Sequence, residues 1–385
     1  MNALIFDKAK SSWQNSRGFD LADIPEPKLG ADDNDKIIIK VRYAGVCGTD
    51  RGIWNRQAFR DAILNSIDEQ IKNGGNSYRV IGHEFFGEIV EVGNDIKDFK
   101  KGDWVACESH VVCNKCLQCL NDQKNVCTNE KILGISLDGG FAEFAKVPGQ
   151  VAWKVNLDKI RPEVAVLHEP FGNAVHAASK TDLKGKTVAI FGLGPIASFL
   201  VVIAKGLGAK TIIGVEPNDK ALDMGKKLGV DYVIPLRNTK GMKDENEKPY
   251  AHNPEVVEQI MKLTDGLGVD VAFEMAGFNS SVNNAIASVR RGGEVILFGL
   301  KNGDFVFEDY NRLVMKGITM HCVAGREIWR TWEIAKKLLE DKTVQDRLFS
   351  VLLQGGRGTI LNIGDYTRER FEQMMAENPK ILIKF

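Results

Sequence analysis

The chain lacks the features of membrane, secreted or nucleic-acid-binding proteins. Its longest strongly apolar stretch, Pro195–Ala204, is closed by Lys205 and is too short to span a bilayer, so it predicts a buried helix. The first ten residues contain no basic start followed by an apolar core and a cleavage site, and we expect no signal peptide. The 51 Lys and Arg residues equal the 51 Asp and Glu residues, which gives no electrostatic case for nucleic acid or an anionic membrane as a partner.

Cysteine is scarce, and the seven that are present are an odd number, four of them bunched together. This distribution argues against a disulfide framework and favours metal binding in a reducing compartment, so we expect a cytoplasmic protein. Internal repeats and low-complexity tracts are absent. A length of 385 residues is more than one compact domain usually carries, so we expect two domains.

The pattern of apolar residues changes along the chain. The first part contains short runs rich in β-branched residues, such as 36–43 and 88–92, punctuated by Gly and Asp. From Lys186 strands alternate with helices, which predicts an α/β domain with a doubly wound parallel sheet. We assign residues 1–155 and 325–385 to the β-rich domain and 156–324 to the second domain. The expected strands of the second domain are 187–191, 211–215, 232–234, 269–274, 294–298 and 318–322.

Four cysteines stand at the spacing C-x2-C-x2-C-x7-C, namely Cys113, Cys116, Cys119 and Cys127. Thiolates are soft ligands, and four of them close a tetrahedron around zinc with no open position. The alternative is four unpaired cysteines in a loop, but free cysteines are normally buried, and this stretch is polar. The spacing therefore predicts a structural zinc site.

A glycine pattern, Gly192-Leu193-Gly194-Pro195-Ile196-Ala197, follows an expected strand and opens an expected helix. The first glycine allows a tight turn, and the second lets the backbone approach a pyrophosphate on the helix N-terminus. Glu216 ends the next strand, 22 positions after Gly194 (216 minus 194). A carboxylate there binds ribose hydroxyls and repels a 2′-phosphate, which favours NAD over NADP. The alternative, a solvated acid, does not explain why Glu216 stands at the strand end. Nearby Lys220 weakens the expected preference for NAD over NADP.

Candidates for a reactive metal are Cys47, His83, Glu84 and Glu169. Cysteine, histidine and carboxylate are suitable zinc ligands, and three of them leave a position for substrate or water. Each residue alone has an ordinary structural explanation, since a lone cysteine is usually core and a lone histidine a satisfied polar group. Their occurrence together with a cysteine cluster and a nucleotide motif favours a catalytic metal.

These motifs resemble the medium-chain zinc-dependent alcohol and polyol dehydrogenases, and most closely the threonine dehydrogenase branch. The resemblance rests on C-G-T-D at 47–50, G-H-E at 82–84, the four-cysteine loop and E-P-F-G-N-A-V-H at 169–176. It implies a GroES-like catalytic domain and a Rossmann domain, a catalytic zinc on Cys47 and His83, Glu84 as a ligand or near-ligand, and Glu169 as an exchangeable ligand or one acting through water. The implied cofactor contacts are Gly192, Gly194, Ile196, Glu216, Phe298, Gly299, Leu300, Val323 and Ala324.

Two departures from the family pattern lie next to the expected substrate. Gly52 replaces a proton-relay histidine, so the hydroxyl proton that Thr49 receives needs another exit, for which His110 is the best candidate side chain. The equal alternative is that His110 binds a backbone carbonyl or substrate and that water carries the proton away. The interval between Cys47 and His83 is also long, and its residues 54–75 have helical spacing, so we expect a lid beside the site. The alternative is a surface decoration remote from the site.

The expected activity is NAD-linked oxidation of a secondary hydroxyl on a small polar substrate. A β-hydroxy amino acid such as threonine is the first hypothesis, and a polyol, sugar or diol is the second. A catalytically silent NAD-binding sensor is the third, opposed by the complete set of metal ligands. The discriminator between the first two is a cation for the substrate carboxylate, for which Arg51, Arg56 and Arg326 are candidates. We expect a homo-oligomer, either a dimer or a tetramer.

Overall fold

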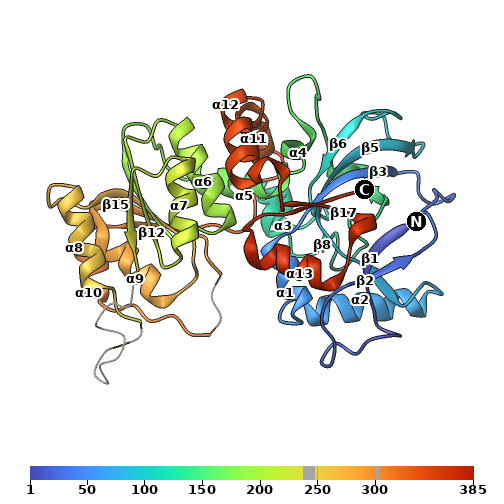
Figure 1. Cartoon of the computed structure of the whole chain (residues 1–385), viewed down its shortest axis with the longest axis horizontal. Helices are drawn as coiled ribbons and strands as arrows, with labels where there is room; N and C mark the ends of the chain where they lie inside the picture. Colours follow the sequence, from blue (N-terminus) through green and yellow to red (C-terminus); the bar gives the residue numbers. More distant parts are fainter. Residues whose placement is uncertain (237–247, 249, 301–302) are drawn as a thin grey trace. The chain divides into compact units, whose positions relative to one another are not determined.

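A computed structural model describes residues 1–236, 248, 250–300 and 303–385, which divide into two compact units (Figure 1). Unit 1 comprises Met1–Pro170 and Glu327–Phe385, and unit 2 comprises Phe171–Arg326. The sequence pattern predicts the first boundary at residue 155. By packing, residues 156–170 belong to unit 1, since the Tyr43 hydroxyl donates to Glu163 (3.4 Å) and the Arg161 amide donates to Gln345 (3.0 Å).

Unit 1 is built on a seven-stranded sheet in the order β10-β6-β5-β3-β18-β17, with β9 also paired to β3. Its central strand alternates as a half-buried strand should: Ile39 and Val41 are buried, whereas Lys40 and Arg42 are exposed. The strands are β3 (Lys36–Gly45), β5 (Glu84–Val92), β6 (Trp104–Cys107), β9 (Phe144–Pro148), β10 (Ala152–Lys154), β17 (Ile360–Asn362) and β18 (Leu382–Lys384). Smaller sheets join β1 (Asn2–Asp7) with β2 (Asp20–Asp23) and β4 (Tyr78–Val80), and β7 (His110–Val111) with β8 (Lys131–Ile132).

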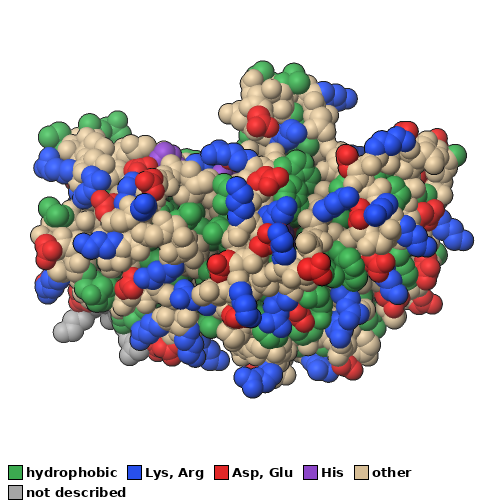
Figure 2. All heavy atoms as spheres, turned by 90° about the horizontal axis from the view of Figure 1, so that it is seen from above, with side chains coloured by type: hydrophobic (Ala, Val, Ile, Leu, Met, Phe, Trp, Pro, Cys, Tyr) green, Lys and Arg blue, Asp and Glu red, His purple; other side chains and the backbone are tan. Residues whose placement is uncertain are grey.

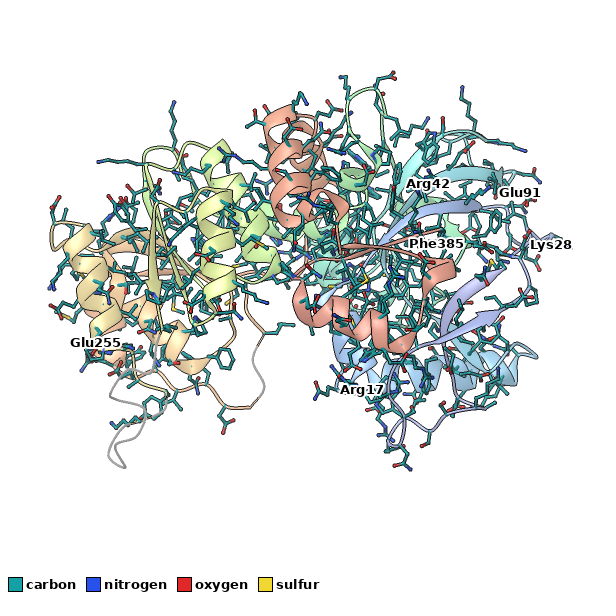
Figure 3. All side chains as sticks on the ribbon, in the orientation of Figure 1. Arg17, Lys28, Arg42, Glu91, Glu255 and Phe385 are labelled. Atoms are coloured by element: carbon teal, nitrogen blue, oxygen red, sulfur yellow. The ribbon has the colours of Figure 1, made fainter. Side chains whose placement is uncertain are left out.

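The C-terminal strand β18 returns to the N-terminal part of unit 1. β18 runs antiparallel to β3, with Ile383 opposite Ala44. The amide of Phe385 donates to the carbonyl of Arg42 (3.3 Å), and Figure 3 labels both residues. The end of the chain therefore packs beside the strand that leads into the C-G-T-D motif.

Residues 54–75 contain the expected helix, α2 (Arg60–Lys72). Ile63 and Ile67 are fully buried in the core of unit 1. The Ser66 hydroxyl lies 3.4 Å from the carbonyl of Ile135 and accepts a bond from Arg79 (3.2 Å). α2 is therefore anchored to unit 1 by core packing and polar contacts, and its role as a lid stays a prediction.

Unit 2 contains a six-stranded parallel sheet in the order β13-β12-β11-β14-β15-β16, the expected doubly wound arrangement. In Figure 1, α6 and α7 lie on one side of the sheet, and α8 and α9 lie on the other. The strands are β11 (Thr187–Phe191), β12 (Thr211–Glu216), β13 (Tyr232–Pro235), β14 (Val269–Glu274), β15 (Val289–Leu297) and β16 (Thr319–Cys322). The helices are α6 (Pro195–Gly206), α7 (Asp219–Leu228), α8 (Pro254–Leu263), α9 (Asn279–Ser288) and α10 (Tyr310–Met315).

A capping residue and a buried apolar surface account for two of the helices in unit 2. The Asn218 side chain accepts a hydrogen bond from the Ala221 amide (3.2 Å) and so caps α7. α6 buries eight consecutive residues, which explains its apolar sequence without a membrane. The polar and charged composition of 237–253 predicts a surface loop, and most of this range lies outside the described residues.

The remaining helices belong to unit 1 or cross its boundary. They are α1 (Gly48–Trp54), α3 (Leu117–Leu120), α4 (Pro162–Ala165), α11 (Arg330–Leu339), α12 (Lys342–Arg347) and α13 (Arg368–Glu377), with α5 (His168–Ala178) crossing the boundary. Among the described helices, none is long and apolar enough to cross a bilayer. On the face shown in Figure 2, basic and acidic side chains are interspersed, in keeping with the balanced composition.

Candidate active site

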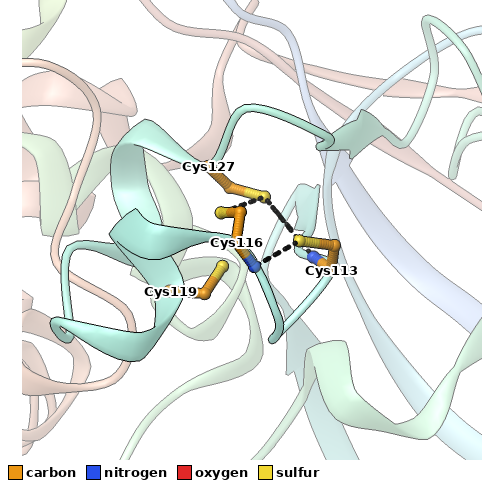
Figure 4. Close-up of side chains that lie close together, drawn as sticks. All are labelled: Cys113, Cys116, Cys119 and Cys127. Carbon is orange, nitrogen blue, oxygen red and sulfur yellow. Dashed lines mark hydrogen bonds between the residues drawn. The ribbon is translucent and has the colours of Figure 1, made fainter.

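The four cysteines of the C-x2-C-x2-C-x7-C motif converge in a loop that follows β7 (Figure 4). Their sulfur atoms all lie within 4.8 Å of one another. The Cys127 sulfur is 3.6 Å from that of Cys113 and 3.8 Å from that of Cys116. None of the seven cysteines is in a disulfide. The arrangement is that of a closed four-thiolate metal site.

The loop backbone favours thiolates over thiols. The Cys116 amide donates to the Cys113 sulfur (3.3 Å), and the Cys113 amide donates to the Cys127 sulfur (3.4 Å). Backbone donors, of which the Cys119 amide contributes most, lower the pKa of Cys116 to about 5. Burial instead raises the pKa of Cys119 to about 12, so this thiol needs a cation to ionise near neutral pH. A soft dication such as zinc fits this donor set.

A second group of possible ligands joins the two motifs that the sequence singled out. One ligand atom each of Cys47, His83 and Glu84 lies within 4.8 Å of the other two. Cys47 precedes α1, whereas His83 and Glu84 stand at the start of β5, and the ladder places Glu84 opposite Gly45. Adjacent strands β3 and β5 therefore bring the motifs together. A thiol, an imidazole and a carboxylate suit a reactive zinc with an open position.

Asp50 supports this group, and the sequence analysis gave it no role. It is fully buried, accepts the Cys47 amide (2.8 Å), and places its other oxygen 3.4 Å from His83 Nδ1, an ion-pair distance without an aligned hydrogen bond. Burial disfavours protonated His83, but Asp50 and Cys47 outweigh that effect and raise its pKa well above the usual range. With Nδ1 facing the carboxylate, Nε2 is the nitrogen left for a metal. The capping spacing of Cys47 and Asp50 was a usable signal in the sequence.

Glu84 is buried beside a second buried charge, Lys380, with which it forms an ion pair. Its Oε1 has no hydrogen-bond partner among the described residues. Burial raises the pKa of Glu84, Lys380 opposes that rise, and the negative charge of Glu169 adds to it. Glu169, itself buried near the start of α5, is therefore within electrostatic reach of the metal group.

His110 is linked to the same region through the backbone. Its neighbour Ser109 accepts the amide of Leu133 (2.9 Å), and Gly134 packs against Gly82, the residue before His83. The buried carboxylate of Glu108 accepts from the amide of His110 and lies 2.9 Å from its Nδ1. A proton on Nδ1 faces this carboxylate, so Nε2 is the basic nitrogen, and a carboxylate oxygen of Glu130 lies 3.9 Å from Nε2. Glu108 also accepts the indole N–H of Trp332 (2.8 Å), which fixes the carboxylate in place.

Two of the three candidate cations for a substrate carboxylate are engaged elsewhere. The Arg51 guanidinium donates to the backbone carbonyls of Met375 (2.6 Å) and Asn378 (2.7 Å). Arg56 donates to the carbonyls of Gly18 and Ile53, both at 2.7 Å. Arg326 belongs to unit 2, is buried, and lies 3.3 Å from the side-chain oxygen of Asn173.

Thr49, expected to accept the hydroxyl proton, lies in α1, directly before Asp50.

The predicted cofactor residues of unit 2 gather at one edge of its sheet. They follow the carboxyl ends of four strands: Gly192, Gly194 and Ile196 after β11, Glu216 at the end of β12, Phe298, Gly299 and Leu300 after β15, and Val323 and Ala324 after β16. Strand order reverses between β11 and β14, which is where open α/β sheets bind nucleotides.

The turn after β11 is open for a phosphate group. Gly192 has φ +90°, where a side chain is strained, and a Cβ added to Gly194 meets nothing within 4 Å. Gly194 is the N-cap of α6, so the helix N-terminus faces this space. Glu216 is held at its strand end, since it accepts the amides of Leu193 (2.8 Å) and Asn218 (3.0 Å). The cradle fits a dinucleotide.

Glu274, at the end of β14, is a further buried carboxylate at this edge to which the sequence analysis gave no role. Its Oε1 accepts the amides of Ala276 (2.9 Å) and Gly277 (2.8 Å). A Cβ added to Gly299 would lie 2.6 Å from Glu274 Oε2, so this carboxylate packs against the loop after β15. Glu274 therefore holds the turn after β14 and packs against the loop after β15, both at the cofactor edge. In the sequence, Glu274 stands out only as part of the stretch Phe273-Glu274-Met275-Ala276-Gly277, which resembles the threonine dehydrogenase branch.

Comparisons with known proteins match two domains of one enzyme family along the chain. The alcohol dehydrogenase GroES-like domain matches residues 33–157, and the zinc-binding dehydrogenase domain matches residues 195–341. The L-threonine 3-dehydrogenase of Pyrococcus horikoshii is 36% identical over 325 residues, 84% of each chain. That of Bacillus licheniformis is 33% identical over 345 residues, 90% of this chain and 89% of its own.

Solved structures share the fold. Alcohol dehydrogenase TADH from Thermus sp. ATN1 has a TM-score of 0.80 and 24% identity, with 100% of this chain and 99% of that chain covered. The 2R,3R-butanediol dehydrogenase of Bacillus subtilis gives the same TM-score, identity and coverage. At this sequence identity the similarity establishes the fold of the chain but not its substrate.

Proposed function

Because the chain belongs to the zinc-binding medium-chain alcohol dehydrogenase family, we propose that it oxidises the secondary hydroxyl of a β-hydroxy amino acid with NAD, as an L-threonine 3-dehydrogenase does. The chain is an oxidoreductase that acts on CH–OH groups with a nicotinamide cofactor. The observation that carries the substrate proposal is the identity of 31% to 37% with L-threonine 3-dehydrogenases over 84% to 90% of the chain.

Cys47 and His83 would hold the reactive zinc, with Glu84 and Glu169 as the carboxylates able to complete its ligand set. Bound zinc supplies Lewis acidity that lowers the pKa of a hydroxyl. Asp50 fixes Cys47 through its amide and orients His83 through Nδ1. The four-cysteine site would hold a second, structural zinc.

Thr49 would receive the hydroxyl proton, and His110 would take it onward as a general base. Glu108 supports this role because it faces Nδ1 of His110 and leaves Nε2 as the basic atom. Gly52 provides no side chain for a relay at the usual position. Water is the other exit, and it would leave His110 as a substrate contact.

NAD rather than NADP is the proposed cofactor, on the strength of Glu216. Its carboxylate ends β12 at the cofactor edge, where it would accept bonds from the ribose hydroxyls and repel a 2′-phosphate. Gly192 and Gly194 would let the pyrophosphate approach the N-terminus of α6. Phe298, Gly299, Leu300, Val323 and Ala324 would line the rest of the cofactor edge.

A polyol, sugar or diol is the second candidate substrate. It is favoured by the engagement of Arg51 and Arg56 with backbone carbonyls, since a substrate carboxylate then has to find another cation. The third reading, a silent NAD-binding sensor, is opposed by the joint presence of the four metal-ligand candidates. Oxidation assays decide among the three.

The test is NADH formation, followed by absorbance, with L-threonine, L-serine, a 2,3-butanediol and a hexitol, each with NAD and with NADP. The proposal requires L-threonine with NAD to give the highest kcat/KM, above that of L-serine, whose hydroxyl is primary. A higher value for the diol or hexitol selects the second candidate, and no turnover with any compound selects the sensor. Mild chelation should remove one of two zinc equivalents and abolish activity, because the open site exchanges first.

We also propose a cytoplasmic homo-oligomer, either a dimer or a tetramer. Strand β16 pairs only with β15 among the described residues, and Val314 and Met315 in the preceding helix α10 are exposed. An open sheet edge flanked by apolar side chains favours pairing with another chain. Light scattering on the eluting protein measures the assembly directly, and a monomeric mass would exclude this proposal.

A further inference from the structure

Glu274 is a buried acid at the cofactor edge of unit 2, where it ends β14. Among the described residues, its Oε1 accepts the amides of Ala276 (2.9 Å) and Gly277 (2.8 Å), and its Oε2 is buried without a hydrogen-bond partner. Backbone N–H groups that donate to a carboxylate form strong, charge-assisted hydrogen bonds. The side chain of Glu274 therefore acts on the backbone of the turn that follows β14.

Glu274 also holds the loop that follows β15. Its backbone carbonyl accepts the amides of Phe298 (3.0 Å) and Gly299 (3.1 Å). A Cβ added to Gly299 would lie 2.6 Å from Oε2 of Glu274 and 2.2 Å from the nitrogen of Gly277. A Cβ added to Gly277 would in turn lie 2.1 Å from the carbonyl oxygen of Leu300. The two glycines thus let the turn and the loop pack directly on the carboxylate.

The two halves of the parallel sheet are expected to take different ends of a dinucleotide. A doubly wound dinucleotide fold consists of two mononucleotide-binding halves, here β11 to β13 and β14 to β16. Glu216 ends β12 in the first half, at the place of the acid that distinguishes the adenosine 2′-hydroxyl from a 2′-phosphate. The second half, in which Glu274 lies, is then left for the nicotinamide mononucleotide.

The first half of the sheet is held by contacts of its own. Glu216 accepts the amides of Leu193 (2.8 Å) and Asn218 (3.0 Å), and the Gly192 amide donates to the carbonyl of Val215 (2.8 Å). None of these bonds involves the Glu274 side chain. A change confined to that side chain should therefore displace the second half and leave the first half in place.

We infer that Glu274 is a positioning residue for the nicotinamide half of the cofactor, and that it acts through the turn after β14 and the loop after β15. The inference rests on the proposed dinucleotide site of unit 2 and requires no particular hydroxy substrate. Hydride transfer needs the reacting atoms in close, aligned contact. A displaced nicotinamide therefore costs turnover as well as affinity, whereas the adenosine half stays bound.

The experiment measures the binding of NAD and of AMP, its adenosine half, to full-length protein by calorimetry. Glu274→Gln keeps the side-chain volume but removes the charge that strengthens two amide bonds, and charged hydrogen bonds are roughly twice as strong as neutral ones. The Kd of NAD should rise about tenfold, and the Kd of AMP should change by less than about twofold. Glu216→Gln should instead weaken both ligands. Glu294→Gln is the matched control, because this β15 acid bonds to Thr181 (2.6 Å) and Lys186 (3.2 Å) and should affect neither.

Gly299→Ala gives a test that does not depend on the folding of Glu274→Gln. Its added Cβ would meet Oε2 of Glu274, so it should also weaken NAD and spare AMP. In the double variant the loss of NAD affinity should be smaller than the product of the two single losses, because both changes disrupt one contact. Equal losses for NAD and AMP, an unchanged affinity for NAD, or losses that multiply in the double variant would each overturn the inference.

Failure of the proposed function gives a different result. Wild-type protein that binds neither NAD nor AMP would show that unit 2 is not the cofactor site, and the inference would fall with it. Wild-type protein that binds both ligands but oxidises none of the hydroxy compounds would refute the proposed activity alone. The Glu274 and Gly299 variants would then still test the inference, since they are read by binding and not by turnover.

Discussion

Replacing Asp50 with Asn should weaken the reactive metal site while leaving its shape intact. Asp50 is fully buried, and its two oxygens face the Cys47 amide (2.8 Å) and His83 Nδ1 (3.4 Å). An asparagine can still accept the Cys47 amide through its carbonyl oxygen. Its amide nitrogen would then face Nδ1, which carries a proton when Nε2 is the ligand, so two donors would oppose each other.

The size of the effect follows from these contacts. A buried donor left without an acceptor costs about 1–3 kcal/mol. Loss of the partner of a ligating histidine typically lowers metal affinity or activity by about 10–100-fold. At 1.36 kcal/mol for each factor of ten, that range is about 1.4–2.7 kcal/mol. The two estimates agree, so we expect Asp50→Asn to lose about one to two orders of magnitude in metal affinity.

The assay is competition for zinc between the protein and a chelator of known affinity, with kcat measured on the same samples. The four-cysteine site provides an internal reference, because Asp50→Asn should leave its zinc in place. Asp33→Asn is the matched control: Asp33 is a buried acid of the same unit, bonded to Lys36 and Lys146, away from the ligand group. It should lower stability without changing zinc affinity. Wild-type zinc affinity in Asp50→Asn would refute the role given to Asp50.

Three further outcomes follow from the site. Glu216→Ala should raise the KM for NAD about tenfold or more and improve use of NADP, because hydrogen bonds to a charged group contribute about 1.5–3 kcal/mol. Steady-state kinetics with both cofactors test this, and an unchanged ratio of kcat/KM for NAD to kcat/KM for NADP would count against it. His110→Ala should lower kcat about a hundredfold and shift the acid limb of the pH–rate profile, whereas a rise in KM alone would make His110 a substrate contact. The Gly30 amide, Lys146 and Lys36 lower the pKa of Asp33. The stability that Asp33 contributes is therefore complete above its unfolded pKa of about 3.9 and is lost as the pH falls through its lower folded pKa. The urea concentration at the unfolding midpoint should therefore fall at acid pH, and Asp33→Asn should remove this fall. A fall of unchanged size in the variant would contradict the prediction.

The Rossmann half of the fold could be predicted closely from the sequence. β11 and β14 have the bounds that the apolar runs indicated, because buried parallel strands are nearly continuous in apolar residues. The antiparallel half was harder, since strands such as β2 and β10 are short and their partners lie far along the chain. The helix in 54–75 was correctly expected, but its two buried isoleucines could not show whether it moves or supports the core.

The candidate ligands could be found in the sequence, and most of the groups that hold them could not. A metal site requires particular residue types, and chain geometry places several of them at short, recognisable spacings, as in the four-cysteine loop. A supporting group has only to present a donor or acceptor at one point in space, which any segment can do. Lys380 is 296 residues from Glu84, and Trp332 is 224 residues from Glu108.

Both of these supporting residues come from the segment that re-enters unit 1 after the nucleotide-binding unit. The return of β18 alongside β3 brings Lys380 to the strand that leads into Cys47, and α11 brings Trp332 to the carboxylate that orients His110. The N-terminal part of unit 1 supplies the reactive groups, and the C-terminal part holds their orientation. Changes in residues 327–385 should therefore alter metal binding and proton transfer without touching a ligand, because these residues fix the charges and hydrogen bonds on which the ligands depend.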